Sequence, residues 1–311
     1  MARIGTSDLE IFPLALGGNV FGWTADKATS FDVLDAFTAG GGNFVDSADV
    51  YSSWVPGNSG GESETIIGEW MQARGNRADV IVATKVGMLA TVKGTSRSSV
   101  RTGVEDSLRR LQTDYIDLYY AHLDDEETPL EETVTSLAEL VTEGKVRYIA
   151  ASNYSAARLQ EALDISERLG IAKFVALQPF YNLVGRSGYE GEVEAVVAAN
   201  GLSTLPYSSL ASGFLTGKYR DGGPAVDSPR AGGAAKYLDD RGRKVLAVLD
   251  EVAAAHSVSV GSVALAWLRA QPTVVAPIAS ARTVDQVPDL LTSATLELTA
   301  AEIQSLTDAS A

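Results

Sequence analysis

Three ionisable residues stand directly after apolar runs that look like buried strands. Asp46 follows Phe44 and Val45, Lys85 follows residues 80–84, and His122 follows residues 116–121. A fourth candidate, Tyr51, comes five residues after Asp46. In a parallel barrel the carboxyl ends of the strands form one rim, so these four side chains are expected to lie together there. A carboxylate, an ammonium, a phenol and an imidazole at one place could transfer a proton to a carbonyl oxygen.

Each of these four side chains has an expected part in that chemistry. A buried lysine needs a counter-charge, and Asp46 is the natural partner of Lys85. The ammonium beside Tyr51 is expected to lower the phenol pKa below ~10 and make it a general acid. His122, neutral in a dry site, would orient the carbonyl oxygen. The alternative is a structural ion pair with two unrelated rim residues, and the coincidence of four strand-end positions speaks against it.

Another set of residues could hold a dinucleotide, although no GxGxxG motif follows a strand. Residues 213–219 resemble a P-loop, but they have three residues between the glycines, so that kind of site is rejected. The segment follows the seventh strand, where barrels bind phosphate through glycine-rich backbone, and Lys218 adds a cation. Arg282 could grip a 2′-phosphate with its forked guanidinium. Tyr207 offers a flat ring to a nicotinamide.

Composition excludes several classes of function. The 311 residues include 25 Lys and Arg against 40 Asp and Glu, a net charge of −15, which argues against a nucleic-acid partner. No cysteine and two histidines leave no metal site expected. No apolar run reaches the ~18 residues of a membrane span. Asp8 and Glu10 stand where a signal peptide would be basic, so a cytoplasmic protein with no membrane partner is expected.

Apolar runs alternate with amphipathic stretches along the chain, which favours an α/β fold of the (β/α)8 TIM-barrel type. Possible capping boxes at residues 128–131 and 299–302 predict helix starts. Ser155 and Gly170 are expected to bound another helix, and Gly144 to end one. The expected strands lie at residues 14–16, 44–45, 80–83, 116–120, 146–150, 174–177, 202–205 and 273–278.

The two ends of the chain and one long loop complete the expected architecture. Residues 3–4 and 9–11 flank a turn and are expected to form a hairpin that plugs the barrel floor. Extra helices are expected at the C-terminus. Residues 219–240 are rich in glycine and proline and could fold over a bound nucleotide as a lid. No linker or repeat interrupts the sequence, so residues 1–311 are expected to form a single domain.

Several motifs, taken together, resemble the aldo/keto reductase superfamily over nearly the whole chain, and most of all its bacterial branch related to potassium-channel β-subunits. Their order and spacing agree with that family. The motifs are GGGNFVDSADVY (40–51), VATKVG (82–87), DYIDLYYAH (114–122), GKVRYIAASNY (144–154), LQPFYN (177–182) and YSSLASGFLTGKY (207–219).

The resemblance implies an NADP(H)-dependent oxidoreductase that reduces an aldehyde or ketone by hydride transfer from nicotinamide C4, or runs the reverse reaction. It implies a catalytic tetrad with Tyr51 as proton donor, and Asp46 would also lie against the cofactor. The tetrad is Asp46, Tyr51, Lys85 and His122. The implied cofactor contacts are Gly18, Asn19, Ser152, Asn153, Gln178, Tyr207, Ser208, Leu210, Ser212, Gly213, Lys218, Ser280, Arg282, Gln286 and Asp289.

Two positions depart from the family pattern. Ser209 stands where the family usually has proline, and Leu290 stands where it usually has asparagine. Leu290 cannot hydrogen-bond the amino group of adenine. The preference for NADP over NAD rests mainly on Arg282, and NAD(H) is not excluded.

Two other functions compete with the reductase. A slow, NADP-binding regulatory or sensor subunit would keep the same fold. A Schiff-base lyase would use Lys85, but Asp46 opposes the neutral amine that such a mechanism needs. The substrate class and the oligomeric state stay open. Four residues in or near the rim loops are candidates for an apolar substrate pocket, namely Phe21, Trp23, Trp54 and Met88.

Overall fold

A closed sheet of parallel strands forms the centre of the molecule. The computed structural model describes residues 1–220 and 228–311. The strands follow one another around the sheet in the order β10-β3-β4-β5-β6-β7-β8-β9. They are β3 (Ala15–Gly17), β4 (Phe44–Asp46), β5 (Ile81–Val86), β6 (Ile116–Ala121), β7 (Val146–Ser152), β8 (Ala176–Gln178), β9 (Ser203–Thr204) and β10 (Ile278–Ala279).

Backbone hydrogen bonds close this sheet into a barrel. β10 pairs with β3 at one edge. At the other edge, the Thr204 amide donates to the Thr273 carbonyl at 2.8 Å, and the Val275 amide donates to the Thr204 carbonyl at 3.1 Å. The Ile278 amide donates to the Pro206 carbonyl at 2.9 Å. The expected (β/α)8 barrel is therefore confirmed.

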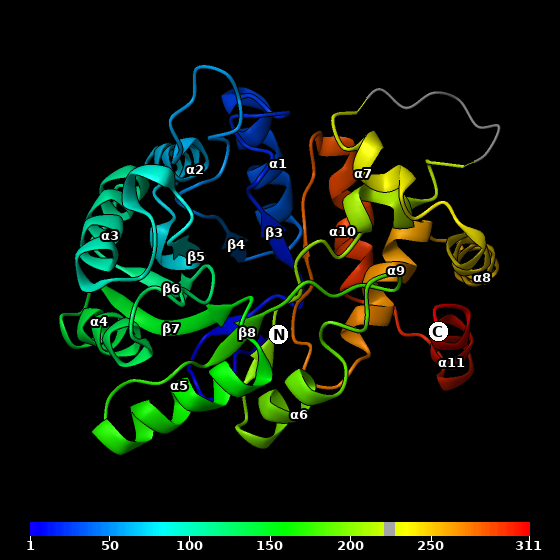
Figure 1. Cartoon of the computed structure of the whole chain (residues 1–311). Helices are drawn as coiled ribbons and strands as arrows, with labels where there is room; N and C mark the ends of the chain where they lie inside the picture. The colour runs from blue at the N-terminus through cyan, green and yellow to red at the C-terminus, as the bar shows by residue number, and fades with distance from the viewer. Residues whose placement is uncertain (221–227) are drawn as a thin grey trace.

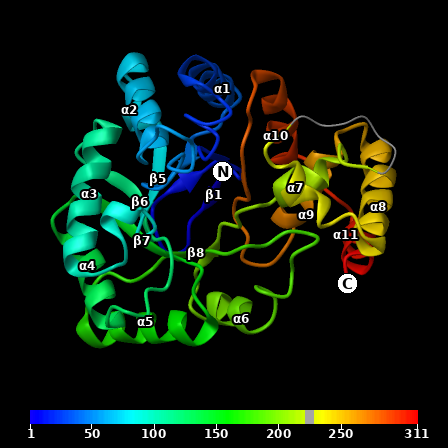
Figure 2. The ribbon, with the colours of Figure 1, turned by 45° about the horizontal axis from the view of Figure 1, so that its top comes forward.

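Helices surround the barrel, and extra helices lie at the C-terminal end of the chain (Figures 1 and 2). Their inward faces join the outer sides of the strands in one large apolar core. No single helix in the described ranges is long and apolar enough to cross a membrane. The helices are α1 (Lys27–Ala39), α2 (Glu62–Arg74), α3 (Arg97–Leu111), α4 (Leu130–Thr142), α5 (Ala156–Leu169), α6 (Glu192–Ala199), α7 (Ala231–Ala235), α8 (Asp240–His256), α9 (Val260–Arg269), α10 (Val287–Ser293) and α11 (Ala300–Ala309).

The expected N-terminal hairpin is present as β1 (Ala2–Arg3) paired antiparallel with β2 (Glu10–Ile11). Ile4, Leu9 and Ile11 are buried and pack with the residues that fill the barrel interior, such as Leu118. The Gly5 amide donates to Ser203 Oγ at the start of β9. The hairpin therefore closes the end of the barrel where the strands begin.

Most of the expected helix ends are confirmed, and one is wrong. Ser155 caps α5, Gly170 ends it in a left-handed conformation, and Thr299 forms the capping box of α11. Thr128 does not cap α4. Its hydroxyl instead donates to Asp125 Oδ2 at 2.7 Å, and α4 begins after Pro129 without a side-chain cap.

Candidate active site

Three of the predicted side chains meet in direct contact at the carboxyl ends of β4 and β5. Lys85 Nζ lies 2.6 Å from Asp46 Oδ2 and 2.9 Å from the Tyr51 hydroxyl. The ammonium also donates to the Ser47 carbonyl at 2.7 Å, so each of its protons has an acceptor. Asp46 and Lys85 are fully buried. The ion pair is therefore held rigidly against the phenol.

Burial dominates the electrostatics of the phenol. Desolvation raises the pKa of Tyr51 above 10, although the Lys85 ammonium acts in the opposite direction. The expectation of a lowered phenol pKa is therefore wrong. The sequence indicated that Lys85 would lie near Tyr51, but it could not indicate how strongly the phenol would be desolvated. Desolvation also opposes the charge of Lys85, yet Asp46 and Tyr51 outweigh it and raise the lysine pKa. At neutral pH the phenol holds its proton and the lysine is charged.

His122 follows β6 and faces the same group, with its ring centroid 6.2 Å from that of Tyr51. Burial lowers the pKa of His122 well below 6.5, and the Lys85 charge lowers it further. The imidazole is therefore neutral at physiological pH and can donate a hydrogen bond. Its Nδ1 atom is buried, and no described residue is its hydrogen-bond partner.

Polar residues at the ends of β7, β8 and β9 brace this group. Gln178 Nε2 donates to Asp46 Oδ1 at 2.9 Å, so its amide already supports the carboxylate. Ser152 Oγ donates to the Gln178 carbonyl at 3.0 Å. Asn153 Nδ2 donates to the His122 carbonyl, and Asn153 Oδ1 accepts from the Tyr207 hydroxyl at 2.9 Å. The predicted nicotinamide residues thus form one continuous network with Asp46 and His122.

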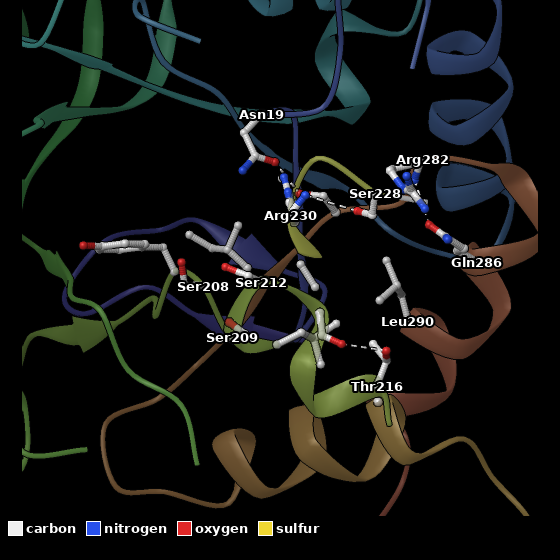
Figure 3. A pocket seen from close by; sticks show the side chains of 18 of the residues that line it. Asn19, Ser208, Ser209, Ser212, Thr216, Ser228, Arg230, Arg282, Gln286 and Leu290 are labelled. Carbon is white, nitrogen blue, oxygen red and sulfur yellow. Dashed lines mark hydrogen bonds between the residues drawn. The ribbon is translucent and has the colours of Figure 1, made fainter. Parts of the chain in front are cut away.

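A cavity of about 650 Å³ opens beside Tyr51 and extends to Arg282 and Gln286. Figure 3 shows polar side chains converging on it from the segment after β9 and from the region after β10. The predicted residues that line it are Asn19, Trp23, Tyr51, Trp54, Tyr207, Ser208, Leu210, Ser212, Gly213, Lys218, Ser280, Arg282, Gln286 and Asp289. The two departing positions, Ser209 and Leu290, line it as well.

Positive charge gathers along the wall of the cavity. Lys218, Arg230 and Arg282 line it, and no carboxylate within the described ranges lies at ion-pair distance from any of them. Burial and the neighbouring Arg282 lower the pKa of Arg230. Two guanidinium groups held so close, in a chain with a net charge of −15, fit a bound anion.

Three of the predicted contacts lie elsewhere. Phe21 is fully buried in the hydrophobic core, Met88 is exposed, and neither of them lines the cavity. Gly17 lines the cavity in place of Gly18, whose amide donates to the Asp46 carbonyl. Trp23 and Trp54 do face the cavity and contact each other edge to face at 5.5 Å. A loop aromatic gives no sign in the sequence of which way it points.

Sequence reasoning missed residues that reach the cavity from loops and helix starts. Arg230 precedes α7, and nothing in its glycine-rich surroundings indicates a ligand site. Ser259 caps α9, which a serine before an apolar helix could have indicated. The predicted lid at 219–240 concerns in part residues 221–227, which lie outside the described residues. The missed lining residues are Gly17, Thr216, Ser228, Arg230, Ser259, Gly261, Ile278 and Ala279.

Comparison with known proteins agrees with this geometry. The sequence profile of the Aldo/keto reductase family matches residues 13–311. The chain belongs to the aldo/keto reductase family. This reductase-family chain is similar to a probable voltage-gated potassium channel subunit beta of Oryza sativa, with 35% identity over 92% of this chain and 88% of the relative.

Other relatives carry oxidoreductase names. An uncharacterized oxidoreductase, YrpG, of Bacillus subtilis is 33% identical over 98% of this chain and 94% of its own length. A norsolorinic acid reductase of Aspergillus flavus is 31% identical over 98% of this chain and 79% of its own length. This protein is therefore an oxidoreductase of the aldo/keto reductase type.

Proposed function

We propose that this protein uses NADP(H) to reduce an aldehyde or ketone to the alcohol, or to run the reverse reaction, with Tyr51 as general acid. One observation carries the proposal: the Tyr51 hydroxyl lies 2.9 Å from Lys85 Nζ and lines the cavity. A buried ammonium bonded to a protonated phenol stabilises the negative charge that develops as the proton leaves. No other described group in the cavity is arranged in this way.

The residues present fit a phosphorylated dinucleotide. The cavity volume of about 650 Å³ is in the range of small-molecule and cofactor sites. Lys218, Arg230 and Arg282 would hold the phosphates, and Tyr207 would lie against the nicotinamide ring. Left-handed backbone at Ser212 and Gly213, with φ of 58° and 90°, lines the same space and would let a phosphate approach the main chain closely. When bound, the reduced nicotinamide supplies the hydride.

The four tetrad residues divide the remaining work. Tyr51 gives its proton to the carbonyl oxygen as the carbon is reduced, and Lys85 stabilises the resulting phenolate. Asp46 keeps the lysine charged and fixed. His122, which is neutral, donates a hydrogen bond to the carbonyl oxygen and so selects the face of the substrate that is presented. Oxidation of the alcohol uses the same groups in reverse.

The Tyr51→Phe variant tests this proposal, because it removes only the hydroxyl. We expect carbonyl reduction to fall by several orders of magnitude, while NADPH affinity changes less than about threefold. A screen of carbonyl compounds with NADPH oxidation as the readout supplies the substrate, and titration of tryptophan fluorescence supplies the affinity. Reduction that persists in the variant contradicts the role of Tyr51.

The alternative function is that of a regulatory subunit, which needs no rapidly reduced substrate. The name of the rice relative refers to a channel subunit, and a sensor of that kind would bind NADPH without rapid turnover. The tetrad and its open cavity favour turnover. A carbonyl screen that finds tight NADPH binding but no oxidation above background would favour the sensor instead.

We also propose that Trp23 and Trp54 contact the substrate, because they line the cavity beside Tyr51. An apolar body attached to the carbonyl would fit such a wall. The Aspergillus relative is named as a reductase of norsolorinic acid. The single-domain organisation, the cytoplasmic location and the absence of a nucleic-acid partner stay predictions.

A further inference from the structure

Asp49 is a buried carboxyl group that the mechanism above does not use. It is 1% exposed, and no described residue donates a hydrogen bond to either of its side-chain oxygens. A buried carboxylate without donors is costly, whereas the neutral carboxylic acid is far less so. Asp49 lies two residues before Tyr51, in the turn between β4 and α2 that carries the proton donor.

No charged or titratable group around Asp49 in the described ranges forms a hydrogen bond or an ion pair with its carboxyl group. Glu64 of α2, which is also fully buried, faces it. Arg110 of α3 is near, but its Nε donates to Glu64 Oε2 at 2.6 Å. Tyr119 of β6 faces it with a hydroxyl that has no described partner. The amides of Val50 and Gly87 approach the Asp49 carboxyl without the geometry of a hydrogen bond.

The main chain of this turn is tied directly to the catalytic pair. The Asp49 amide donates to the Lys85 carbonyl at 3.1 Å, and the Tyr51 amide donates to the Ala48 carbonyl at 3.2 Å. The turn is also packed tightly, since a Cβ added at Gly60 would lie 3.0 Å from the Asp49 carbonyl oxygen. A shift of Asp49 therefore moves Tyr51 relative to Lys85.

We propose that Asp49 is a positioning residue: its neutral carboxyl keeps the 47–51 turn in place, and its ionisation displaces the turn and separates Tyr51 from Lys85. The inference rests on the proposed function and adds a control by pH to the same site. Burial, followed by the charge of Glu64, raises the pKa of Asp49 to about 7. The control therefore operates in the physiological range.

The neighbouring catalytic groups do not titrate in that range. The pKa of Tyr51 is raised above 10 by burial, and Asp46 and Tyr51 raise that of Lys85 against the effect of burial. The pKa of His122 is lowered well below 6.5 by burial and by Lys85. A loss of activity centred near pH 7 would therefore identify Asp49.

The test compares wild-type protein with Asp49→Asn, which keeps the shape and removes the charge. With saturating NADPH and a carbonyl compound that the enzyme reduces, kcat/KM of the wild type should fall about tenfold from pH 6 to pH 8, as one ionising group with a pKa near 7 requires. The variant should keep the activity that the wild type has at pH 6, with less than a twofold change. Asp164→Asn, which changes an exposed carboxylate on α5, is the matched control and should follow the wild type.

Two structural readouts keep the test independent of turnover. The infrared band of a protonated carboxyl should disappear from the wild type near pH 7 and be missing from Asp49→Asn at all pH values. Hydrogen exchange of the 47–51 turn, corrected for its intrinsic pH dependence, should speed up over the same interval only in the wild type. If no carbonyl compound is reduced, the proposed function fails, whereas these two measurements still decide whether Asp49 moves the turn.

A second variant covers the case in which Asp49→Asn fails to fold. Glu64→Gln removes the repelling charge and frees Arg110, so the carboxyl of Asp49 should ionise at lower pH and the midpoint of every readout should shift downward. A midpoint that stays in place in Glu64→Gln overturns the proposal. So does an Asp49→Asn profile that matches the wild type.

Discussion

At the scale of single residues, the active site balances charge against burial. Asp46, Lys85 and Tyr51 would each be unfavourable alone in the barrel, and together they satisfy one another. The sequence could predict which residues meet, because strand ends share one rim. It could not predict the direction of the Tyr51 pKa, since only the folded chain shows how far the phenol is withdrawn from water.

The ion pair leads to a prediction about stability. Lys85→Met leaves the Asp46 carboxylate buried with Gln178 as its main donor, so the free energy of unfolding should fall by about 3–5 kcal/mol. The double variant Asp46→Asn with Lys85→Met removes the unpaired charge and should recover a large part of that loss. Urea denaturation measures both. A double variant no more stable than the single one would show that lost packing, not the isolated charge, is responsible.

Arg282 leads to a prediction about cofactor choice. If its guanidinium binds the 2′-phosphate, Arg282→Ala should weaken NADPH binding at least tenfold and leave NADH binding nearly unchanged, because a charged hydrogen bond is worth about 1.5–3 kcal/mol. Fluorescence titration gives both dissociation constants. Arg168→Ala, which removes an exposed arginine paired with Glu131, is the control. An equal loss for both cofactors would place Arg282 on a part of the ligand that they share.

At the scale of elements, the segment after β9 gives the cavity much of its wall. Ser208, Ala211, Ser212 and Gly213 all have positive φ, so a short stretch of tightly turned backbone lies along the cavity before Gly217 ends the 3-10 helix η3 (Ala211–Thr216). The glycines and their place after the seventh strand could be recognised in the sequence. Thr128 shows the limit of prediction from sequence motifs, because its hydroxyl donates to the Asp125 carboxylate instead of capping α4.

Gly213 should therefore tolerate substitution poorly. Its φ is +90°, and an added Cβ would lie 3.3 Å from Lys218 Cε, so Gly213→Ala should cost about 1 kcal/mol of stability and also weaken NADPH binding several-fold. Gly144→Ala is the matched control, since Gly144 has φ of +74° with nothing within 4 Å. It should lose similar stability and no affinity. Urea denaturation and fluorescence titration measure the two effects, and unchanged affinity in Gly213→Ala would remove this backbone from the cofactor site.

At the scale of the whole molecule, the barrel was predictable and the cavity wall was only partly so. Eight apolar runs with helical stretches between them are typical of a (β/α)8 barrel. Arg230 could not be found, because its position depends on how a long glycine-rich connection returns to the barrel, and no local pattern fixes that path. The buried position of Phe21 could not be predicted for the same reason, since the direction of a loop side chain is fixed only by the folded chain.

Asp49 ties the stability of the whole fold to pH. Its pKa rises from 3.8 unfolded to about 7 folded, so the folded state holds an extra proton between these values. The resulting stability is present at low pH and is lost as pH rises through 7, with a maximum of roughly 4 kcal/mol. Asp49→Asn should thus become more stable relative to wild type from pH 5 to pH 8. Urea denaturation at both pH values checks this, and a constant difference would contradict it.

The plug formed by β1 and β2 separates the two mouths of the barrel. Because it fills the end where strands begin, Met1 emerges on the side away from the cavity, and 72% of its surface is exposed. An affinity tag, a fusion partner or a solid support joined there would leave the catalytic rim facing open solution.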